Sequence, residues 1–455
     1  EDATPVEEIG EGCVVSGPSE PLTPGESWSM EMTLPAGGEC TLEVTLSADT
    51  VWEVVVSGGV AGALVSPPED EPGWRRPTLT EAGQHVVQVA NPGAASLDVT
   101  VSLIGHGVPP GPLEDARSLV WTTAPMTEWT SLAQLMAVVS EDGHGGALLK
   151  QWFERFASTA HSERLGPLLL LQAYEAVLGI EPSTWDLSLL PFHVTGVHNR
   201  MDLADGTHCG ELRVSLASHD PTYTPLHLIF LFYQPPAPDD VSPHGSVHCT
   251  GTALRWARLS ELDDDAAFEV AAKAWLDAVL VSESFGLIET VEFIVSPWEW
   301  RQWFLADGVL DNRPLFQTID IPTLNAPGPL RESFLTWVSE HAEDLVMRRA
   351  VIPEVYRSAS ARAAQGIPWV PLDLSGVADG VLEAWPGLRQ QIELVGCPGC
   401  HTADAEFLQT DEDGSLSSFY TKELGARAGY LESHWFGGPA DPPFGPLQVG
   451  PVAHP

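Results

Sequence analysis

The first hundred residues alternate apolar and polar side chains with a period of two, which is typical of half-buried antiparallel strands. Clusters of glycine and proline, such as Leu34–Gly38 and Asn91–Gly93, separate these runs. The pattern predicts strands at Ser27–Leu34, Cys40–Leu46, Val51–Val56, His85–Val89 and Ser96–Leu103. Residues 1–108 are therefore expected to form an all-β sandwich that serves as an accessory domain.

After Gly105–Pro112, a linker rich in glycine and proline, apolar residues recur three and four positions apart, as in amphipathic helices. Helices are expected at Trp129–Val139, Ala147–Phe156, Leu168–Leu178, Asp263–Ser284 and Pro329–Val346. Strands are expected at Phe192–Val197, Glu211–Leu216, Leu226–Tyr233 and Ile288–Val295. The run Leu226–Tyr233 is apolar on both faces, which favours a central strand. Because no βαβ rhythm is visible, residues 113–365 are predicted to be a central α+β domain.

Beyond Pro353 the sequence is rich in Ser, Ala and Arg and compatible with a helix, until Gly366–Pro371 forms a second linker. Val377–Val395 predicts a helix that leads into a Cys-x-x-Cys-His motif, and Ser417–Ala428 predicts another. Residues 372–455 are therefore expected to be a mainly helical segment. The fold class predicted for the whole chain is a multidomain protein with three parts: sandwich, α+β domain and helical segment.

The chain carries 63 acidic and 21 basic residues, a formal charge of −42. Such a surface repels nucleic acid and anionic lipid, so neither is expected as a partner, whereas calcium or a basic redox partner would be attracted. No apolar run approaches the ~20 residues that span a bilayer, so no membrane span is expected. The acidic start at Glu1 looks like a mature N-terminus after removal of a signal peptide.

Six cysteines form three local pairs along the sequence: Cys13 with Cys40, Cys209 with Cys249, and Cys397 with Cys400. An even number in such pairs suits an oxidising compartment, so a periplasmic or extracellular location is expected. If the third pair holds a haem, the first two pairs are the expected disulfides.

The third pair belongs to the motif Cys397-Pro398-Gly399-Cys400-His401. In an exported protein this spacing attaches haem c covalently: two thiols form thioether bonds to the porphyrin, and the adjacent imidazole binds the iron. The alternative is a tight redox or structural disulfide with a histidine beside it by chance.

The motif and the helix predicted before it resemble c-type cytochromes, in which a distal iron ligand follows later in the chain. That ligand is commonly methionine, yet all six Met residues here precede the motif. His434, flanked by Trp435 and Phe436, could complete a bis-histidine site. Alternatively, the sixth position is open, or a histidine of the central domain fills it. Since few residues follow the motif, the haem segment is expected to pack on the central domain.

The region 193–248 concentrates histidines: His193, His198, His208, His219, His227, His244 and His248. If Cys209 pairs with Cys249, the imidazoles of His208, His244 and His248 could converge on zinc or copper. The alternative is that these histidines are hydrogen-bonded strand and loop residues.

The same region holds Asn199-Arg200-Met201-Asp202 and Glu211-Leu212-Arg213, whose charged side chains suit either of two roles. They could be ion-paired supports for loops or an acid/base set beside a cofactor.

Two further resemblances concern longer stretches. Gly25-Glu26-Ser27 before the first strand and Gly83-x-His85-x-Val87 before a late one are similar to small jelly-roll modules of secreted bacterial peptidases, which implies an accessory role without catalysis. The stretches Val197–Leu203, Cys209–Arg213 and Pro297–Arg301 resemble parts of large exported bacterial proteins of unassigned function that also end in a Cys-x-x-Cys-His region.

Three functions follow as expectations. The first is an exported monohaem c-type protein that performs electron transfer or haem-based redox chemistry with a redox partner protein or a small-molecule oxidant or reductant. The second is a secreted zinc- or copper-dependent enzyme that uses the histidines between His193 and His248. The third is an extracellular binding module stabilised by disulfides. The sequence has no Gly-x-Ser-x-Gly, phosphate loop, His-Glu-x-x-His or dinucleotide fingerprint, so several enzyme classes lose their support.

Overall fold

A computed structural model of the chain describes the following residues: 21–24, 26–34, 40–46, 53–57, 74–75, 78–79, 83–90, 99–105, 113–156, 166–205, 207–218, 226–237, 240–241, 247, 249–292, 298–315, 318–347, 350–364, 367–368, 371–394, 410 and 415–435. These residues form a mixed α+β protein with more than one structural unit. Among the helices of these residues, none is both long and apolar enough to cross a membrane.

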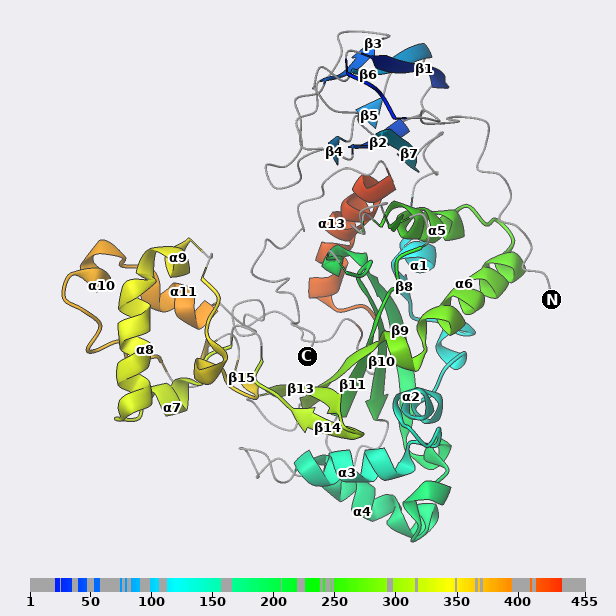
Figure 1. The fold of residues 1–455 in the computed structure, drawn as a ribbon. Coiled ribbons are helices and arrows are strands. Elements are labelled where there is room, and N and C mark those ends of the chain that lie inside the picture. Colours follow the sequence, from blue (N-terminus) through cyan, green and yellow to red (C-terminus); the bar gives the residue numbers. More distant parts are fainter. Residues whose placement is uncertain are drawn as a thin grey trace.

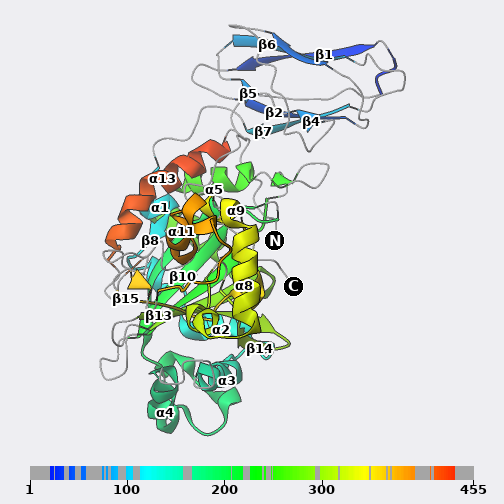
Figure 2. The same ribbon diagram turned by 90° about the vertical axis from the view of Figure 1, so that its left-hand side faces the viewer.

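The N-terminal part consists of two antiparallel sheets that lie one above the other in both views (Figures 1 and 2). One sheet has the order β1-β6-β3, with β1 at Ser27–Leu34, β6 at Gly83–Ala90 and β3 at Glu53–Ser57. In the other, β2 (Cys40–Leu46) pairs with β4 (Trp74–Arg75), β5 (Thr78–Leu79) and β7 (Val99–Gly105). Each strand predicted from the two-residue period is present. The short strands β4 and β5 were not predicted, because two residues cannot show a period.

The central part is built on one antiparallel sheet, which has nine strands within the described part of the chain. Its order is β16-β15-β13-β12-β11-β10-β9-β8, and β14 pairs with β13. The bounds are β8 Val120–Trp121, β9 Phe192–Arg200, β10 Glu211–Ser218, β11 Leu226–Tyr233, β12 Phe285–Glu292, β13 Trp298–Ala306, β14 Val309–Asn312, β15 Ala361–Ala364 and β16 Ile367–Pro368. Strand β11 is interior and buried along its length except at Tyr233, which confirms that it is a central strand.

Helices of the middle of the chain contribute to a large core with the sheet. They are α1 Asp115–Ser118, α2 Leu132–Val139, α3 Gly146–Phe156, α4 Gly166–Leu178, α5 Thr250–Ser260 and α6 Asp265–Val279. Single-turn helices lie at Met126–Glu128, Pro182–Thr184, Leu187–Leu189, η4 Met201–Leu203, Ser282–Ser284 and Glu354–Tyr356. Aromatic residues fill the core, and the rings of Phe156 and Trp303 lie 4.6 Å apart between centroids.

Local capping explains where two of these helices begin. The side chain of Ser131 accepts a hydrogen bond from the backbone N–H of Gln134, so α2 begins at Leu132, three residues later than the apolar period suggested. The carboxylate of Asp264 accepts from the N–H of Ala266 at the start of α6. Helix α6 ends at Val279 instead of Ser284, because the backbone at Leu280 leaves the helical conformation.

The predicted helix Pro329–Val346 is two helices, α8 Pro329–Glu340 and α9 Ala342–Val346. His341 ends one and begins the next: its N–H donates to the carbonyl of Trp337, and its carbonyl accepts from the N–H of Leu345. Together with α7 (Ile321–Asn325), α10 (Val381–Ala384) and α11 (Leu388–Leu394), they form a lobe on the β15 side of the sheet (Figure 1).

The prediction of one helix over Val377–Val395 is wrong, since α10 and α11 are separate. Pro386 has no N–H to donate, and it disfavours helical geometry at Trp385, which adopts φ −127° and ψ 70°. The lobe has its own apolar core, which joins Leu324, Phe334 and Ile352 to Leu388 and Ile392. Residues on both sides of 365–372 therefore contribute to one apolar cluster.

Among the described residues of 353–371 there is no α-helix, only the single turn at Glu354–Tyr356, and the second linker contains the paired residues Ile367 and Pro368 of β16. Ala361 and Ala363 of β15 stand opposite Trp300 and Trp298 in the sheet. Small side chains next to large ones suit cross-strand packing, and pairing with β13 overrides the helical propensity of alanine.

The last described helix, α13 (Ser418–Trp435), extends beyond the predicted Ser417–Ala428 and lies against α5 (Figures 1 and 2). Its residues Tyr420, Leu424 and Leu431 belong to the large core of the central part. Helix α13 is therefore packed on the central part of the protein.

Candidate functional site

The residues of the Cys-x-x-Cys-His motif, Cys397, Cys400 and His401, lie outside the described residues. His434 belongs to α13 through its backbone, while its side chain is outside the description. Cys13, the predicted partner of Cys40, also lies outside the described residues. The haem attachment, the distal role of His434 and the first disulfide therefore remain predictions.

Thr410, nine positions after His401, is a described residue and marks where the chain downstream of the motif meets the sheet. Its side chain is buried, and its Oγ1 lies 2.9 Å from Oγ1 of Thr195 on β9. A Cβ on Gly196 would lie 2.9 Å from the Thr410 methyl carbon, so the missing side chain at Gly196 permits this close approach.

His198 lies at the same place on β9 and is fully buried. Neither of its ring nitrogens has a hydrogen-bond partner among the residues that the structure describes. A Cβ on Gly196 would stand 2.8 Å from Nε2 of His198, so the imidazole packs directly against the bare glycine and a larger residue there would clash with it. The ring of Tyr420 meets the imidazole edge to face, with 5.2 Å between the centroids.

Charged side chains surround His198. Arg200 holds Asp202 with two hydrogen bonds of 2.9 Å, from Nε to Oδ1 and from Nη2 to Oδ2. Arg427 of α13 lies 4.0 Å from the same carboxylate, and its guanidinium stands over the ring of Tyr420 at 4.5 Å. Burial opposes the charge on Asp202, but Arg200 and Arg427 outweigh it and bring the pKa of Asp202 to about 2.

The pKa of His198 is well below 6.5, first because the ring is buried and then because Arg427, Arg213 and Arg200 disfavour a second positive charge. The imidazole is therefore neutral at physiological pH. A neutral imidazole is the form that binds metal ions.

A second set of ion pairs joins two side chains of β10 to each other and to β12. Arg213 on β10 lies 2.7 Å from the carboxylate of Glu211 and 3.5 Å from that of Glu289 on β12. Burial raises the pKa of Glu289, and the nearby Arg213 opposes that rise. Asn199 faces the other side, where its Nδ2 donates to the carbonyl of Ser118. These contacts favour the interpretation of this motif as ion-paired support for the strands.

Directly opposed residues of neighbouring strands point to the same side of a sheet. His198 pairs with Arg213, Arg213 with Leu231, and Leu231 with Leu287. We call this side of the sheet the His198 face. It also carries an apolar cluster of Ile229, Leu231, Leu287 and Val291 with Trp300 and Phe304 packed against it. A buried imidazole, a set of arginines and an apolar surface therefore share one face.

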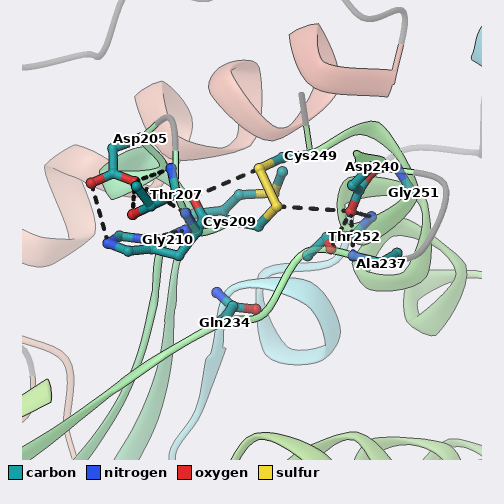
Figure 3. Close-up of a disulfide and its surroundings, with 12 residues drawn as sticks. Asp205, Thr207, Cys209, Gly210, Gln234, Ala237, Asp240, Cys249, Gly251 and Thr252 are labelled. Carbon is teal, nitrogen blue, oxygen red and sulfur yellow. Dashed lines mark hydrogen bonds and ion pairs between the residues drawn. A yellow bond between two sulfur atoms is a disulfide. The ribbon is translucent and has the colours of Figure 1, made fainter. Parts of the chain in front are cut away.

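The predicted disulfide between Cys209 and Cys249 is present, with 5.3 Å between the Cα atoms (Figure 3). It joins the residue before the Gly210 turn into β10 to the residue before α5. The N-terminus of α5 is capped from a distance: the Asp240 carboxylate accepts from the N–H groups of Gly251 and Thr252 and from the Thr252 hydroxyl (Figure 3). No local spacing in the sequence signals this cap, because Asp240 lies outside the helix.

His208, one of the three residues predicted for a zinc or copper site, uses both ring nitrogens. Nδ1 accepts from the N–H of Gly210 at 3.2 Å, and Nε2 lies 3.4 Å from the Asp205 carboxylate. Its ring stacks on Tyr233 at 4.3 Å. His244 and His248 lie outside the described residues, and within the described ones no three His, Cys, Asp or Glu side chains form a metal-binding group. Metal binding by His208 would require it to give up one of these bonds.

His227 on β11 predicts a pH dependence of stability. Burial, with His193 nearby, lowers the pKa of His227 from 6.5 to about 4. The unfolded chain therefore takes up a proton that the folded chain does not, and stability falls as pH decreases from 6.5 towards 4. The difference between these two pKa values corresponds to about 3 kcal/mol of the free energy of unfolding. We expect His227→Gln to flatten the pH dependence of urea unfolding between pH 7 and pH 4.5, a range in which Asp202 stays ionised. An unchanged pH slope in this variant would contradict the assignment.

Comparison of the chain with known protein families, with curated proteins and with solved structures found no match. The sequence and the geometry of the His198 face are thus the basis for a functional assignment.

Proposed function

We propose that this chain is an exported monohaem c-type protein that performs electron transfer or haem-based redox chemistry. Cys397 and Cys400 would hold the porphyrin through thioether bonds, and His401 would bind the iron. The sequence Cys397-Pro398-Gly399-Cys400-His401 is the observation that carries this proposal. Haem would supply a one-electron centre, and a site for a small ligand if a coordination position is open.

The His198 face lies where the chain downstream of the motif meets the sheet. Thr410 ties the chain downstream of the motif to β9 through Thr195. Beside that contact lies the fully buried imidazole of His198, which packs against the bare backbone of Gly196. The apolar cluster around Leu231 and Leu287 on the same face suits a flat hydrophobic macrocycle.

The residues of this face have definable roles in such a protein. The apolar cluster would exclude water from the porphyrin, which influences the reduction potential. Arg213, held between Glu211 and Glu289, would keep a fixed charge arrangement near His198. Tyr420 and the close-packed α13 would hold the imidazole of His198 in one orientation.

Three further parts of the proposal concern location, partners and architecture. The Cys209–Cys249 disulfide supports an oxidising compartment such as the periplasm or the extracellular space. The charge of −42 suits a basic redox partner protein. The two N-terminal sheets would form an accessory sandwich, and residues 372–455 a haem segment packed on the central domain.

The test is the absorption spectrum of the full chain, produced in a host that matures c-type haem. We expect a Soret band that survives acid-acetone extraction and an intact mass increased by one haem. Cys397→Ala or Cys400→Ala should weaken covalent retention, because each removes one thioether bond. His401→Ala should keep the haem attached but change the iron spectrum.

The matched control is the double variant Cys209→Ala/Cys249→Ala, which removes two cysteines that form a disulfide instead. It should retain the haem fully. A colourless wild-type protein whose mass shows only the loss of six hydrogens would contradict the proposal and favour three disulfides.

A further inference from the structure

Helix α13 contacts the central sheet partly through the imidazole of His198 on β9, which meets the ring of Tyr420. We propose that this contact is sensitive to acid: proton uptake by His198 releases α13 from the sheet while β11 and its neighbours stay folded. The trigger is a proton, and the release is a local opening of the structure and not its global unfolding. This inference goes beyond the function proposed above and does not depend on the attachment of haem.

The first argument is the tight packing of the imidazole. His198 is fully buried, and an added Cβ on Gly196 would lie 2.8 Å from its Nε2. The ring of Tyr420 meets it edge to face, with 5.2 Å between the centroids. Among the residues that the structure describes, neither ring nitrogen has a hydrogen-bond partner. An imidazolium has two N–H donors that need acceptors or solvent, so proton uptake favours a state in which α13 has moved away.

The second argument is the positive charge around this ring. The guanidinium groups of Arg200 on β9, Arg213 on β10 and Arg427 on α13 all disfavour a positive charge at His198. Burial and these three groups, in that order, hold the pKa of His198 well below 6.5. Arg427 also stands over the ring of Tyr420 at 4.5 Å. Helix α13 therefore brings both the ring that covers the imidazole and one of the charges that oppose its protonation.

The acidic groups near this contact do not offset those charges. The acidic and phenolic groups around it are Asp202 on η4, Glu211 on β10, Glu289 on β12 and Tyr430 on α13. The first two already accept hydrogen bonds from Arg200 and Arg213. Burial raises the pKa of the third, and burial with Asp202 nearby raises that of the tyrosine to about 12. Within the described residues, an imidazolium at His198 would thus be a fourth positive charge without a carboxylate of its own.

The direction of the pH dependence follows from the two states of the helix. When α13 is released, solvent reaches the imidazole and its pKa returns to about 6.5. The released state then binds a proton that the docked state does not, so docking weakens as pH decreases from 6.5 towards the lower pKa of the docked ring. Each pH unit in this interval favours release about tenfold. Asp202, whose pKa is about 2, stays ionised and does not contribute.

The test is hydrogen–deuterium exchange of the full chain at pH 7 and pH 5, measured by mass spectrometry and corrected for the intrinsic effect of pH on exchange. We expect peptides from α13 to lose about twentyfold in protection at pH 5, while peptides from β11 remain more protected. His198→Phe should abolish the loss in α13, because a phenyl ring suits the same place and takes up no proton. The matched control is His227→Phe, which removes another buried histidine, and its α13 peptides should respond as in the wild type.

A second variant, His198→Gln, covers the case in which His198→Phe does not fold. Glutamine is uncharged at both pH values, so its α13 peptides should also show no response to pH. Equal protection of wild-type α13 at pH 7 and pH 5 would overturn the inference. A response that persists in the His198 variants, or that disappears in His227→Phe, would do the same. Joint exchange of α13 and β11 at pH 5 would show global unfolding and would also overturn it. A protein without haem would refute only the proposed function, since exchange needs no haem spectrum.

Discussion

Replacing Glu299 with alanine is expected to lower the free energy of unfolding by about 3 to 5 kcal/mol, which is typical of breaking a buried ion pair. Glu299 and Arg301 on β13 are each no more than 1% exposed. The guanidinium donates to Oε1 of Glu299 from Nε at 3.0 Å and from Nη2 at 2.9 Å. It also stands over the ring of Phe156 at 5.1 Å. Without the carboxylate, the charge of Arg301 stays buried and loses its main counter-ion. Urea denaturation at pH 7 measures the loss.

The matched control is Asp277→Ala, which removes an exposed partner of Lys273 on α6. Exposed pairs of this spacing contribute no more than about 0.5 kcal/mol. The double variant Glu299→Leu/Arg301→Met should be more stable than Glu299→Ala, since it buries apolar groups and no charge. A cost for Glu299→Ala close to that of Asp277→Ala would show that the buried pair is not important for stability.

The second large effect is expected from Cys209→Ala/Cys249→Ala, which should lower the free energy of unfolding by about 2 to 4 kcal/mol. The disulfide closes a loop between residues separated by 40 positions, and its removal gives the unfolded chain more conformational freedom. It also releases the turn before β10 from the start of α5. Alanine suits both positions because the cysteines are buried. The midpoint and slope of urea unfolding, measured with and without reductant, give the change.

Wild-type protein under strong reducing conditions should approach the stability of the double variant. The variant lacks Cys209 and Cys249, so breaking this disulfide cannot change its own stability. Equal unfolding midpoints for oxidised wild type and variant would contradict the expected contribution.

The regular elements of the fold are largely predictable from periodicity, because burial of one face imposes a period on the sequence. The two-residue period located β1 and β2 to the residue, and the run of apolar residues identified β11 as interior. Pro386 also signals the break between α10 and α11 in the sequence, although the apolar period on both sides hides it.

The rest depends on long-range contacts that no local pattern encodes. The alanines of β15 look helical until the tryptophans of β13 stand opposite them. Asp240 caps α5 only because the loop brings it there. In the candidate site, the histidines and cysteines are visible in the sequence. The meeting of Thr410 with Thr195, close to His198 on β9, emerges only from packing.

The contact between α13 and the central part has a consequence for the order of events during synthesis. Tyr420 donates to the carbonyl of Leu119 from 301 positions away, and Leu424 and Leu431 complete a core that begins at Leu119. While the ribosome is still making this last helix, the core has an open side, so the central part cannot reach its final state until residue 431 has emerged. The Cys-x-x-Cys-His motif leaves the ribosome before that moment. Because α13 follows the motif in the sequence, any export or folding that proceeds from the N-terminus presents the two thiols before the core that α13 completes is closed.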